Sequence, residues 1–369
     1  MKWIFNLKKK SENDRPKISK KKEWFNAVLF AVVAATFIRG LLFSAYAIPS
    51  GSMEGTLLTG DYLFVSKISY GPRMPFTPVQ NPFLESTITK HHIKTYWDGI
   101  KLPYFRLPGL SAIKKGDIVV FNKPEEADPS FDRPIDVRTN LIKRCQALPG
   151  DVLTLVNGQV YVNGKAADNP AQSETSYSVI TDGNSINPQL FEDLNIEILQ
   201  QDDLYTYVMN IPNASLSALK GYSFIKSMDA VVAPAGSYDA AIFPHNDQFK
   251  WNLDNFGPLT LPAKGMTISL NSANLILYRR AIELYEHNKV AIQGNNVLIN
   301  GKKADNYTFK MNYYWMMGDN RHNSMDSRFW GYVPEDHVIG KAMITWMSID
   351  SARNFMDKVR WNRILKVIE

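Results

Sequence analysis

The chain has 369 residues, of which 45% are hydrophobic and 21% are charged; this composition excludes wholesale disorder and is sufficient for a sizeable core. A single cysteine, Cys145, excludes an intramolecular disulfide framework and any cysteine-rich metal site. The net charge of +6 comes from residues 1–23, which hold nine Lys or Arg and three Asp or Glu. Because the rest of the chain is balanced, the composition argues against a nucleic-acid-binding body.

The first predicted element is a transmembrane anchor at residues 24–43, preceded by the basic, cytoplasmic segment 1–23. No charge interrupts Trp24–Ile38, and the apolar character resumes after Arg39 and continues to Ile48. This run is long enough to cross a bilayer. The lysines directly before it predict that the N-terminus lies in the cytoplasm and that everything after the run lies outside.

Two other interpretations of the apolar run stay open on the sequence alone. A buried core helix fits poorly with three neighbouring lysines. A cleaved signal peptide fits better, because Ala45-Tyr46-Ala47 resembles a small-x-small cleavage site. The long charged region and Arg39, which interrupts the apolar run, favour a retained anchor.

The remainder of the chain predicts a mainly β fold. Runs of β-branched and aromatic residues alternate with turn residues, and Asn157-Gly158 is a strong hairpin signal. The predicted strands are Asp61–Ser69, Asp117–Asn122, Leu141–Leu148, Val152–Val156, Gln159–Val162, Val297–Asn300 and His337–Met347.

These strands define a β-rich core over residues 44–164 and 290–350, with two interruptions. Residues 72–110 are rich in proline and aromatic side chains and predict an irregular insertion. Residues 165–289 differ in character and predict an inserted α+β subdomain. Residues 351–369 form a basic C-terminal tail, which either rests on anionic lipid head groups or is a plain terminal strand or helix.

A helix is expected inside the inserted subdomain, over Ser272–Glu286. Ser272 is a residue type that caps helix N-termini. Four residues recur at helical spacing and predict one buried face: Leu275, Tyr278, Ile282 and Tyr285.

Three polar segments carry the candidate chemistry. Ile48–Leu57, directly after the anchor, has small residues around Ser50 and Ser52, although an ordinary linker has the same composition. Leu141–Asp151 predicts a strand with Lys143 among apolar neighbours and Arg144 pointing the other way, although a surface lysine on a two-faced strand is commoner.

The third segment, Met317–Arg328, is dense in polar and charged side chains, which must satisfy one another if they are buried. Asp326 and Arg328, with Arg144, are expected to form a buried ion network that supports a site. A polar surface loop is the alternative.

Burial away from water lowers the pKa of a lysine amine. A buried Lys143 can therefore lose its proton and act as a neutral base. Lowering its pKa from about 10.4 to about 8 costs roughly 3 kcal/mol, which a folded scaffold can sustain. Six scattered histidines, among which His91-His92 is the only close pair, predict no metal site.

Together these segments resemble the bacterial type I signal peptidase, or leader peptidase, family. Its serine box matches Pro49–Leu57, its strand motif matches Gly60–Lys67, its lysine box matches Lys143–Asp151 and its last box matches Gly318–Arg328. One position departs from the pattern, because Gly55 stands where the family usually has proline before Thr-Leu. This change leaves the stiffness of the loop to its packing.

The resemblance implies that Ser52 is the nucleophile and Lys143 the general base of a Ser–Lys dyad. It also implies that the Ser50 hydroxyl and the Ser52 backbone N–H form the oxyanion hole, and that Ser324 orients the Lys143 amine. The residues implied to support the lysine strand or its amine are Ser324, Asp326, Arg328 and Arg144. The residues implied to line shallow apolar pockets are Ile48, Met53, Leu57, Leu141 and Ile142.

The same resemblance implies a signal-peptidase-like β fold and a membrane-anchored serine endopeptidase that removes N-terminal signal peptides after small-x-small sites. It places the catalytic part on the outer side of a bacterial cytoplasmic membrane. The implied partners are preproteins with signal peptides, membrane lipid and the neighbouring Sec translocon; no nucleic acid, metal or cofactor is implied.

Two other functions remain open on the sequence. One is a soluble Ser–Lys peptidase of the self-cleaving repressor class, against which the anchor and the outward topology argue. The other is a non-catalytic anchored β scaffold that presents the inserted subdomain to a partner. The second predicts that substitution of Ser52 or Lys143 leaves preprotein processing untouched.

Overall fold

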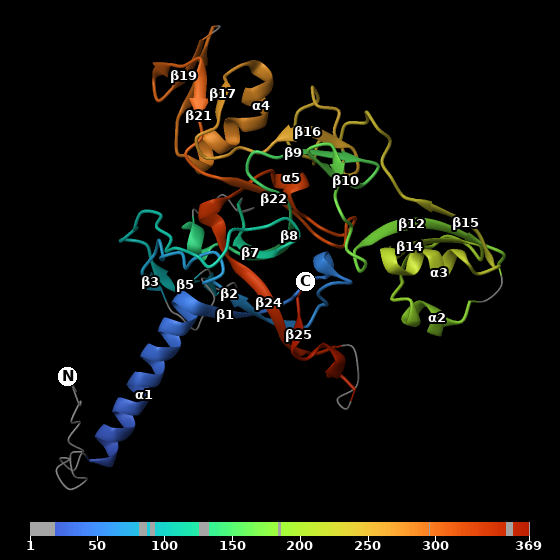
Figure 1. The fold of residues 1–369 in the computed structure, drawn as a ribbon, viewed down its shortest axis with the longest axis horizontal. Helices are drawn as coiled ribbons and strands as arrows, with labels where there is room; N and C mark the ends of the chain where they lie inside the picture. Colours follow the sequence, from blue (N-terminus) through green and yellow to red (C-terminus); the bar gives the residue numbers. More distant parts are fainter. Residues whose placement is uncertain are drawn as a thin grey trace, which may run out of the picture.

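Antiparallel strands build most of the body, as the sequence predicts. The computed structural model describes residues 19–80, 87–88, 93–124, 133–183, 186–294, 296–351 and 357–368. Figure 1 shows a helix projecting from one end of a β-rich body and a smaller lobe at the other end. The histidine pair at 91–92 lies outside the described residues.

The predicted anchor is a single long helix. Helix α1 (Lys20–Phe37) begins at Ser19, whose side chain accepts a hydrogen bond from the Lys22 N–H, and it continues as the π-helical turn η2 (Ile38–Leu42). Its 23 residues correspond to a length of about 35 Å, enough to span a hydrocarbon core. No residue of α1 is buried, and Figure 1 shows the helix projecting from the body.

The helical part ends at Leu42, one residue before the end of the predicted anchor at residue 43. Residues 43–48 do not extend the helix: Phe43–Ala47 is strand β1, which pairs with β2 (Asp61–Ser66) over its whole length. Hydropathy cannot separate the last turn of an apolar helix from an apolar strand that follows it. The Ala45-Tyr46-Ala47 segment is therefore part of the sheet.

The main sheet joins segments from both ends of the chain. Its strand order is β1-β2-β24-β7-β8-β22-β23, with β25 paired to β24. Register shifts within the β2–β24, β24–β7 and β8–β22 pairs increase its local twist. Besides β1 and β2, this sheet contains β7 (Ile118–Asn122), β8 (Asn140–Ala147), β22 (Tyr313–Met317), β23 (Val333–Pro334), β24 (Val338–Ser348) and β25 (Lys366–Val367).

A second sheet continues the chain after β8, and it holds the predicted Asn157-Gly158 hairpin. Its order is β11-β10-β9-β16. The strands are β9 (Val152–Val156), β10 (Gln159–Val162), β11 (Lys165–Ala166) and β16 (Phe256–Thr260). All seven predicted strands are present, although β2 ends at Ser66 rather than Ser69.

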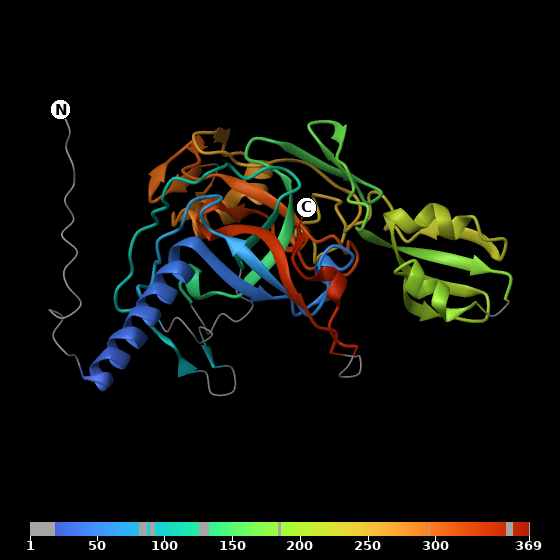
Figure 2. The same ribbon diagram turned by 60° about the horizontal axis from the view of Figure 1, so that its bottom comes forward.

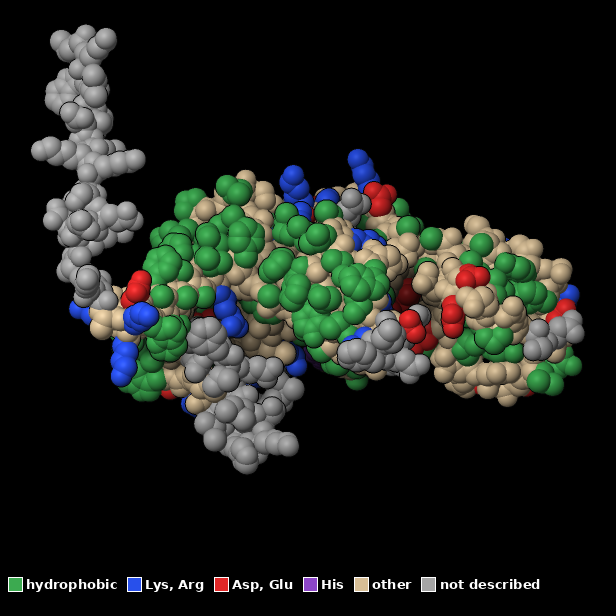
Figure 3. All heavy atoms as spheres, turned by 90° about the horizontal axis from the view of Figure 1, so that it is seen from below, with side chains coloured by type: hydrophobic (Ala, Val, Ile, Leu, Met, Phe, Trp, Pro, Cys, Tyr) green, Lys and Arg blue, Asp and Glu red, His purple; other side chains and the backbone are tan. Residues whose placement is uncertain are grey.

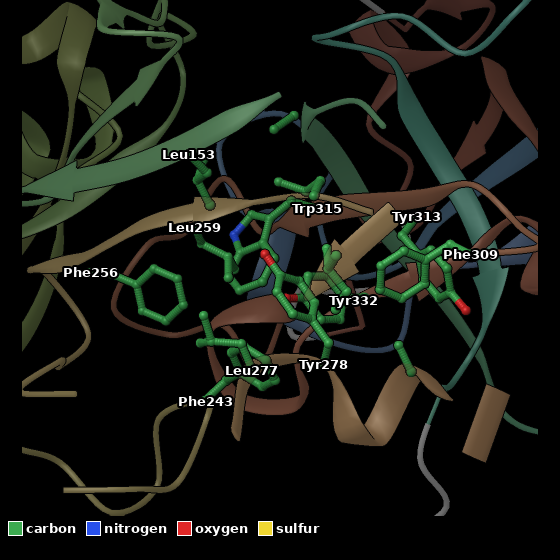
Figure 4. Packing of buried hydrophobic residues seen from close by; sticks show 14 of the residues in the cluster. Leu153, Phe243, Phe256, Leu259, Leu277, Tyr278, Phe309, Tyr313, Trp315 and Tyr332 are labelled. Atoms are coloured by element: carbon green, nitrogen blue, oxygen red, sulfur yellow. The ribbon is translucent and has the colours of Figure 1, made fainter. Parts of the chain in front are cut away.

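The largest hydrophobic core lies between this second sheet and the helix α4 (Ser272–Arg280). Figure 4 shows its aromatic centre, in which Trp315 packs against Phe256 with ring centroids 5.1 Å apart and Tyr332 stacks on Tyr278 at 5.9 Å. The predicted buried face of this helix is confirmed, because Leu275, Tyr278, Ile282 and Tyr285 are all buried.

The ends of that helix differ from the prediction. Its α-helical part stops at Arg280 and continues as the π-helical turn η6 (Ala281–Tyr285). The cap is Asn271 rather than Ser272, because the Asn271 side chain accepts a hydrogen bond from the Asn274 N–H at 2.8 Å. Asparagine and serine cap almost equally well, so neighbouring candidates are hard to separate from sequence.

The smaller lobe is a four-stranded sheet of order β13-β14-β12-β15, with helices α2 and α3 beside it (Figures 1 and 2). Its own buried cluster includes Val179, Met209 and Leu219. The elements are β12 (Glu174–Thr181), α2 (Pro188–Asp193), β13 (Glu197–Gln201), β14 (Thr206–Pro212), η5 (Asn213–Ser215), α3 (Leu216–Lys220) and β15 (Ile225–Ala230).

Residues 165–289, which the sequence predicts to be one inserted subdomain, contribute to two different hydrophobic cores. Residues 174–230 have the core just described, whereas Phe243, Phe256 and Tyr278 contribute to the largest core of the body. We therefore propose that the independently packed unit is the smaller lobe, residues 174–230.

The remaining elements are short. Two-stranded sheets are formed by β3 (Val79–Gln80) with β6 (Tyr96–Trp97), β4 (Thr87–Ile88) with β5 (Ile93–Lys94), and β17 (Thr267–Ser269) with β21 (Asn306–Thr308). A three-stranded sheet is formed by β18 (Val290–Gln293), β19 (Asn296–Ile299) and β20 (Lys302–Lys303). Short helices are η3 (Gly51–Met53), η4 (Ile135–Val137), α5 (Ser327–Trp330), η7 (Glu335–His337) and η8 (Trp361–Arg363).

The basic tail folds onto the domain. Strand β25 pairs with β24, and the buried Arg363 guanidinium binds the Asp61 carboxylate, with Nε 3.0 Å from Oδ1. Arg363 Nη2 also donates to the Thr56 carbonyl at 2.9 Å. The tail thus contacts the loop that follows the candidate serines.

Candidate active site

Ser52 lies in η3, a short 3₁₀ helix between strands β1 and β2. The turn is held by apolar residues on either side of the serine, because Ile48, Met53 and Leu57 are buried in one cluster beneath it. Ser50 is extended and exposed at the start of the turn. The small residues that looked like a linker therefore form an ordered loop.

Lys143 reaches the serine from the neighbouring part of the sheet. Strand β8 places it opposite Val119 of β7, and its side chain is 3% exposed. Its amine donates to Ser52 Oγ at 2.7 Å and to the Ile142 carbonyl at 3.0 Å. Burial lowers the pKa of the Lys143 amine to about 8, although Asp326 and Asp319 partly oppose this shift.

Arg144 points away from Lys143, as predicted, but its partner is different. Its guanidinium makes a bidentate ion pair with Asp319, with Nε–Oδ1 at 2.9 Å and Nη2–Oδ2 at 2.8 Å. Asp319 Oδ2 also accepts a hydrogen bond from the Thr56 hydroxyl at 2.6 Å. One carboxylate thus joins the lysine strand to the serine loop.

Asp326 and Arg328 form a second buried pair, as predicted, but Arg144 is not part of it. Arg328 donates to Asp326 through Nε at 2.9 Å and Nη2 at 2.8 Å. Asp326 also accepts the Gly318 N–H at 3.0 Å. Burial by itself raises the pKa of the Asp326 carboxyl. The Arg328 guanidinium opposes this effect and holds that pKa below its usual value.

Ser324 lies near these groups but does not make the expected hydrogen bond to Lys143. Its hydroxyl is buried, and it has no hydrogen-bond partner among the residues that the structure describes. It packs against Gly318, where a Cβ atom would collide with both the Ser324 hydroxyl and the Ser52 carbonyl. Only glycine at 318 allows the last box to approach the serine loop this closely.

The five residues expected to line the pockets do not all lie together. Ile142 packs with Ile48, Met53 and Leu57, whereas Leu141 packs in the separate cluster around Val119 and Phe121. Met53 and Leu57 are fully buried, so they form the floor beneath the serine loop.

Sequence reasoning missed three supporting residues: Thr56, Asp319 and Arg363. Asp319 is part of the Gly-Asp-Asn motif, but nothing in the sequence identifies Arg144 and Thr56 as its partners. Arg363 is more than 300 residues from Asp61, the carboxylate that it neutralises. Such pairings become visible only in the fold.

The first strand of the smaller lobe also contacts the last box. The Glu174 N–H donates to the Asp319 carbonyl at 2.9 Å, and the Arg321 N–H donates to the Glu174 carbonyl at 2.9 Å. The Glu174 side chain is buried near Gly55. Burial, together with Glu54 and Glu197, raises the pKa of the Glu174 carboxyl to about 8.

Comparison with known proteins identifies the family. The model of the family described as "Signal peptidase, peptidase S26" matches residues 21–229 and 302–347, which is more than half of the chain. Signal peptidase I of Buchnera aphidicola subsp. Schizaphis graminum is 26% identical over 95% of this chain and 86% of its own length.

Two further relatives are similar over most of both chains. Signal peptidase I of Haemophilus influenzae is 27% identical over 93% of this chain and 75% of its own length. Signal peptidase I of Helicobacter pylori is 24% identical over 94% of this chain and 91% of its own length.

Proposed function

The chain belongs to the signal peptidase family S26, and from this premise we propose that it cleaves signal peptides with Ser52 as nucleophile and Lys143 as general base. Membership of the family makes it a serine endopeptidase whose substrates are preproteins with signal peptides. The observation that carries the residue assignment is the 2.7 Å contact between the Lys143 amine and the Ser52 hydroxyl.

The burial of Lys143 supports its role as base. A neutral amine accepts a proton, and a pKa of about 8 leaves part of the population neutral near pH 7. Neutral Lys143 takes the Ser52 proton as Oγ forms a bond to the scissile carbonyl carbon. The protonated amine then gives that proton to the departing amide nitrogen, and the C–N bond breaks.

Hydrolysis of the acyl-enzyme uses the same two groups in reverse. Lys143, neutral again, takes a proton from a water molecule that attacks the ester carbonyl. The Ser52–acyl bond breaks, and the proton returns to Ser52 Oγ through the lysine. Protons therefore balance over the cycle without a histidine.

The oxyanion hole is assigned to the Ser50 hydroxyl and the Ser52 backbone N–H. The Ser52 N–H belongs to the first turn of η3, where backbone N–H groups have no partner within the turn. Each well-placed donor at such a position typically contributes about 3–4 kcal/mol to transition-state stabilisation.

Small-x-small selectivity is assigned to the apolar side of the dyad. Ile48 and Ile142 pack together beside Ser52 and Lys143, over the buried Met53 and Leu57. A shallow apolar surface of this kind suits small apolar side chains such as alanine.

The helix α1–η2 is proposed to cross the cytoplasmic membrane, with residues 1–23 inside and the body outside. It is long and apolar enough to span, and lysines flank its N-terminal end. Hydrophobic side chains gather over the face of the body seen from below, the side from which α1 projects (Figure 3). This arrangement supports contact with membrane lipid, close to the Sec translocon from which substrates emerge.

Two substitutions test the dyad. Ser52→Ala and Lys143→Met in the full chain are expected to abolish cleavage of a preprotein with an Ala-x-Ala site, with rates at least about a thousandfold below wild type. Ser215→Ala, in the smaller lobe, and Lys303→Met, on an exposed strand, are the matched controls and should retain activity. Cleavage at the wild-type rate by Lys143→Met would remove the proposed base and support a different mechanism.

A further inference from the structure

The direction of the anchor helix is not fixed by side-chain packing. None of the residues 20–37 is buried, and the helix leaves the body at its C-terminal end (Figures 1 and 2). A helix attached in this way pivots about its junction unless other bonds hold that junction. The contacts of residues 38–44 therefore decide how the body sits relative to a membrane.

Lys67 makes three hydrogen bonds to this junction. It directly follows strand β2, and its backbone N–H donates to the Leu42 carbonyl at 2.9 Å. Its side-chain amine donates to the Arg39 carbonyl at 2.8 Å and the Gly40 carbonyl at 3.2 Å. The Ser44 hydroxyl donates to the same Arg39 carbonyl at 3.0 Å.

The chemistry of a helix end explains why a lysine suits this place. The last carbonyls of a helix lack partners within it and carry partial negative charge, so a cation beside them is stabilising. The π-helical turn η2 presents the carbonyls of Arg39 and Gly40 to the Lys67 amine. Burial lowers the pKa of the Lys67 amine to about 8, and Arg73 and Arg39 add to the shift. Among the described residues, the hydrogen-bond partners of this amine are the carbonyls of Arg39 and Gly40.

The same hairpin links the helix end to the nucleophile. Strand β1 leads from the anchor to the serine loop, and it pairs with β2 from Phe43↔Ser66 to Ala47↔Tyr62. A five-residue strand is about 17 Å long. A swing of about 20° at the helix end therefore moves the serine loop by roughly 6 Å relative to the membrane, which is large compared with the tolerance of a catalytic site.

We propose that Lys67 is a positioning residue that locks the anchor helix to the β1–β2 hairpin and so sets the position of Ser52 relative to the bilayer. This inference rests on the proposed function, because it concerns substrates presented at the membrane. It predicts that Lys67 matters for a membrane-borne preprotein and not for a soluble peptide.

The kinetic test uses the full chain in phospholipid vesicles, with Lys67→Met, Lys67→Arg and the control Lys303→Met. We expect Lys67→Met to lose roughly tenfold or more in kcat/KM on a vesicle-inserted preprotein, while its kcat/KM on a soluble peptide with an Ala-x-Ala site changes less than about twofold. Lys67→Arg, which keeps the donors, should recover most of the loss. Equal losses on both substrates, or no loss on the preprotein, would overturn the proposal.

A second measurement does not depend on catalysis. Spin labels at Val28→Cys in the helix and at Val156→Cys on the exposed side of β9 report the helix–body distance, since the native Cys145 is fully buried. Lys67→Met should broaden the distance distribution, and Lys67→Arg should not. An unchanged distribution in Lys67→Met would refute the lock even if the dyad is correct, whereas a wild-type chain inactive on both substrates would refute the proposed function alone.

Discussion

Lys143 is buried next to a serine, yet the two nearby carboxylates are engaged by other cations. Asp319 binds Arg144, and Asp326 binds Arg328. Both carboxylates raise the pKa of the Lys143 amine, each is paired with an arginine, and the charge of Arg328 lowers that pKa. The hydrogen bonds of the amine go to a hydroxyl and a carbonyl, both uncharged. The arginines therefore help to make a base as well as to hold the strand.

At the residue scale, Gly318 is a tightly enclosed position beside the dyad. Gly318→Ala places a methyl group where the Ser52 carbonyl and the Ser324 hydroxyl lie. We expect kcat/KM on a soluble peptide to fall by about a hundredfold or more, since small displacements of reacting groups have effects of this size. The control Gly221→Ala, at a residue with φ of −75°, brings its methyl group no closer than 3.3 Å to the Ala218 carbonyl oxygen, and it should keep activity. Near-normal kinetics in Gly318→Ala would show that the loop accommodates the methyl group.

The roles of single residues were predictable where the sequence itself carries the pattern. Alternation in the strand at 141–148 predicted that Lys143 and Arg144 diverge, and they do. The density of polar groups in 317–328 predicted an ion network of Asp326, Arg328 and Arg144, of which the Asp326–Arg328 pair is present. The Ser324–Lys143 hydrogen bond was expected and is not seen. Partners far apart in the chain, such as Thr56 and Asp319, depend on the fold and have no local signal.

At the scale of elements, the C-terminal tail supports the serine loop. Arg363 is buried against Asp61 and reaches the Thr56 carbonyl. Arg363→Met leaves the Asp61 charge buried without its partner, which typically costs about 3–5 kcal/mol of stability. We expect a lower midpoint in urea and slower peptide cleavage, whereas Lys366→Met, on an exposed position of β25, should resemble wild type. An unchanged midpoint for Arg363→Met would show that the tail does not stabilise this loop.

Element ends were less predictable than element types. The predicted anchor ended at residue 43 and the helix ends at Leu42, but the hydropathy of residues 43–47 carries no information about their pairing with β2. The tail's sequence left lipid contact and a plain terminal strand or helix open; the tail forms strand β25, and Arg363 is buried inside the domain. In both segments the deciding contacts come from strands that are distant in sequence.

At the scale of the whole molecule, the smaller lobe has a core of its own but is attached to the last box through Glu174. Met209 is fully buried in that core. Met209→Ala should destabilise the lobe by about 2–5 kcal/mol. In hydrogen exchange we expect faster exchange across β12–β15, with exchange of β7, β8 and β24 unchanged. Uniformly faster exchange across both parts would show that the lobe and body unfold as one unit.

The architecture as a whole was predicted better than its boundaries. The family, the mainly β fold and the long N-terminal helix follow from motifs and periodicity, and the comparisons and the structure bear them out. The division of residues 165–289 was not visible in the sequence, since Phe243 and Phe256 join the body's core through contacts with distant residues such as Trp315.

The most direct test of the account is the titration of the Lys143 amine itself. Carbon-13 labelling of the lysine side chains, with Lys143→Met to assign the signal, gives its pKa in the folded chain. The account predicts a midpoint near pH 8 and a kcat/KM that rises with pH through the same midpoint, because only the neutral amine takes the Ser52 proton. A Lys143 amine that titrates at its ordinary value, about 10.4, with an activity profile that does not follow it, would contradict the account.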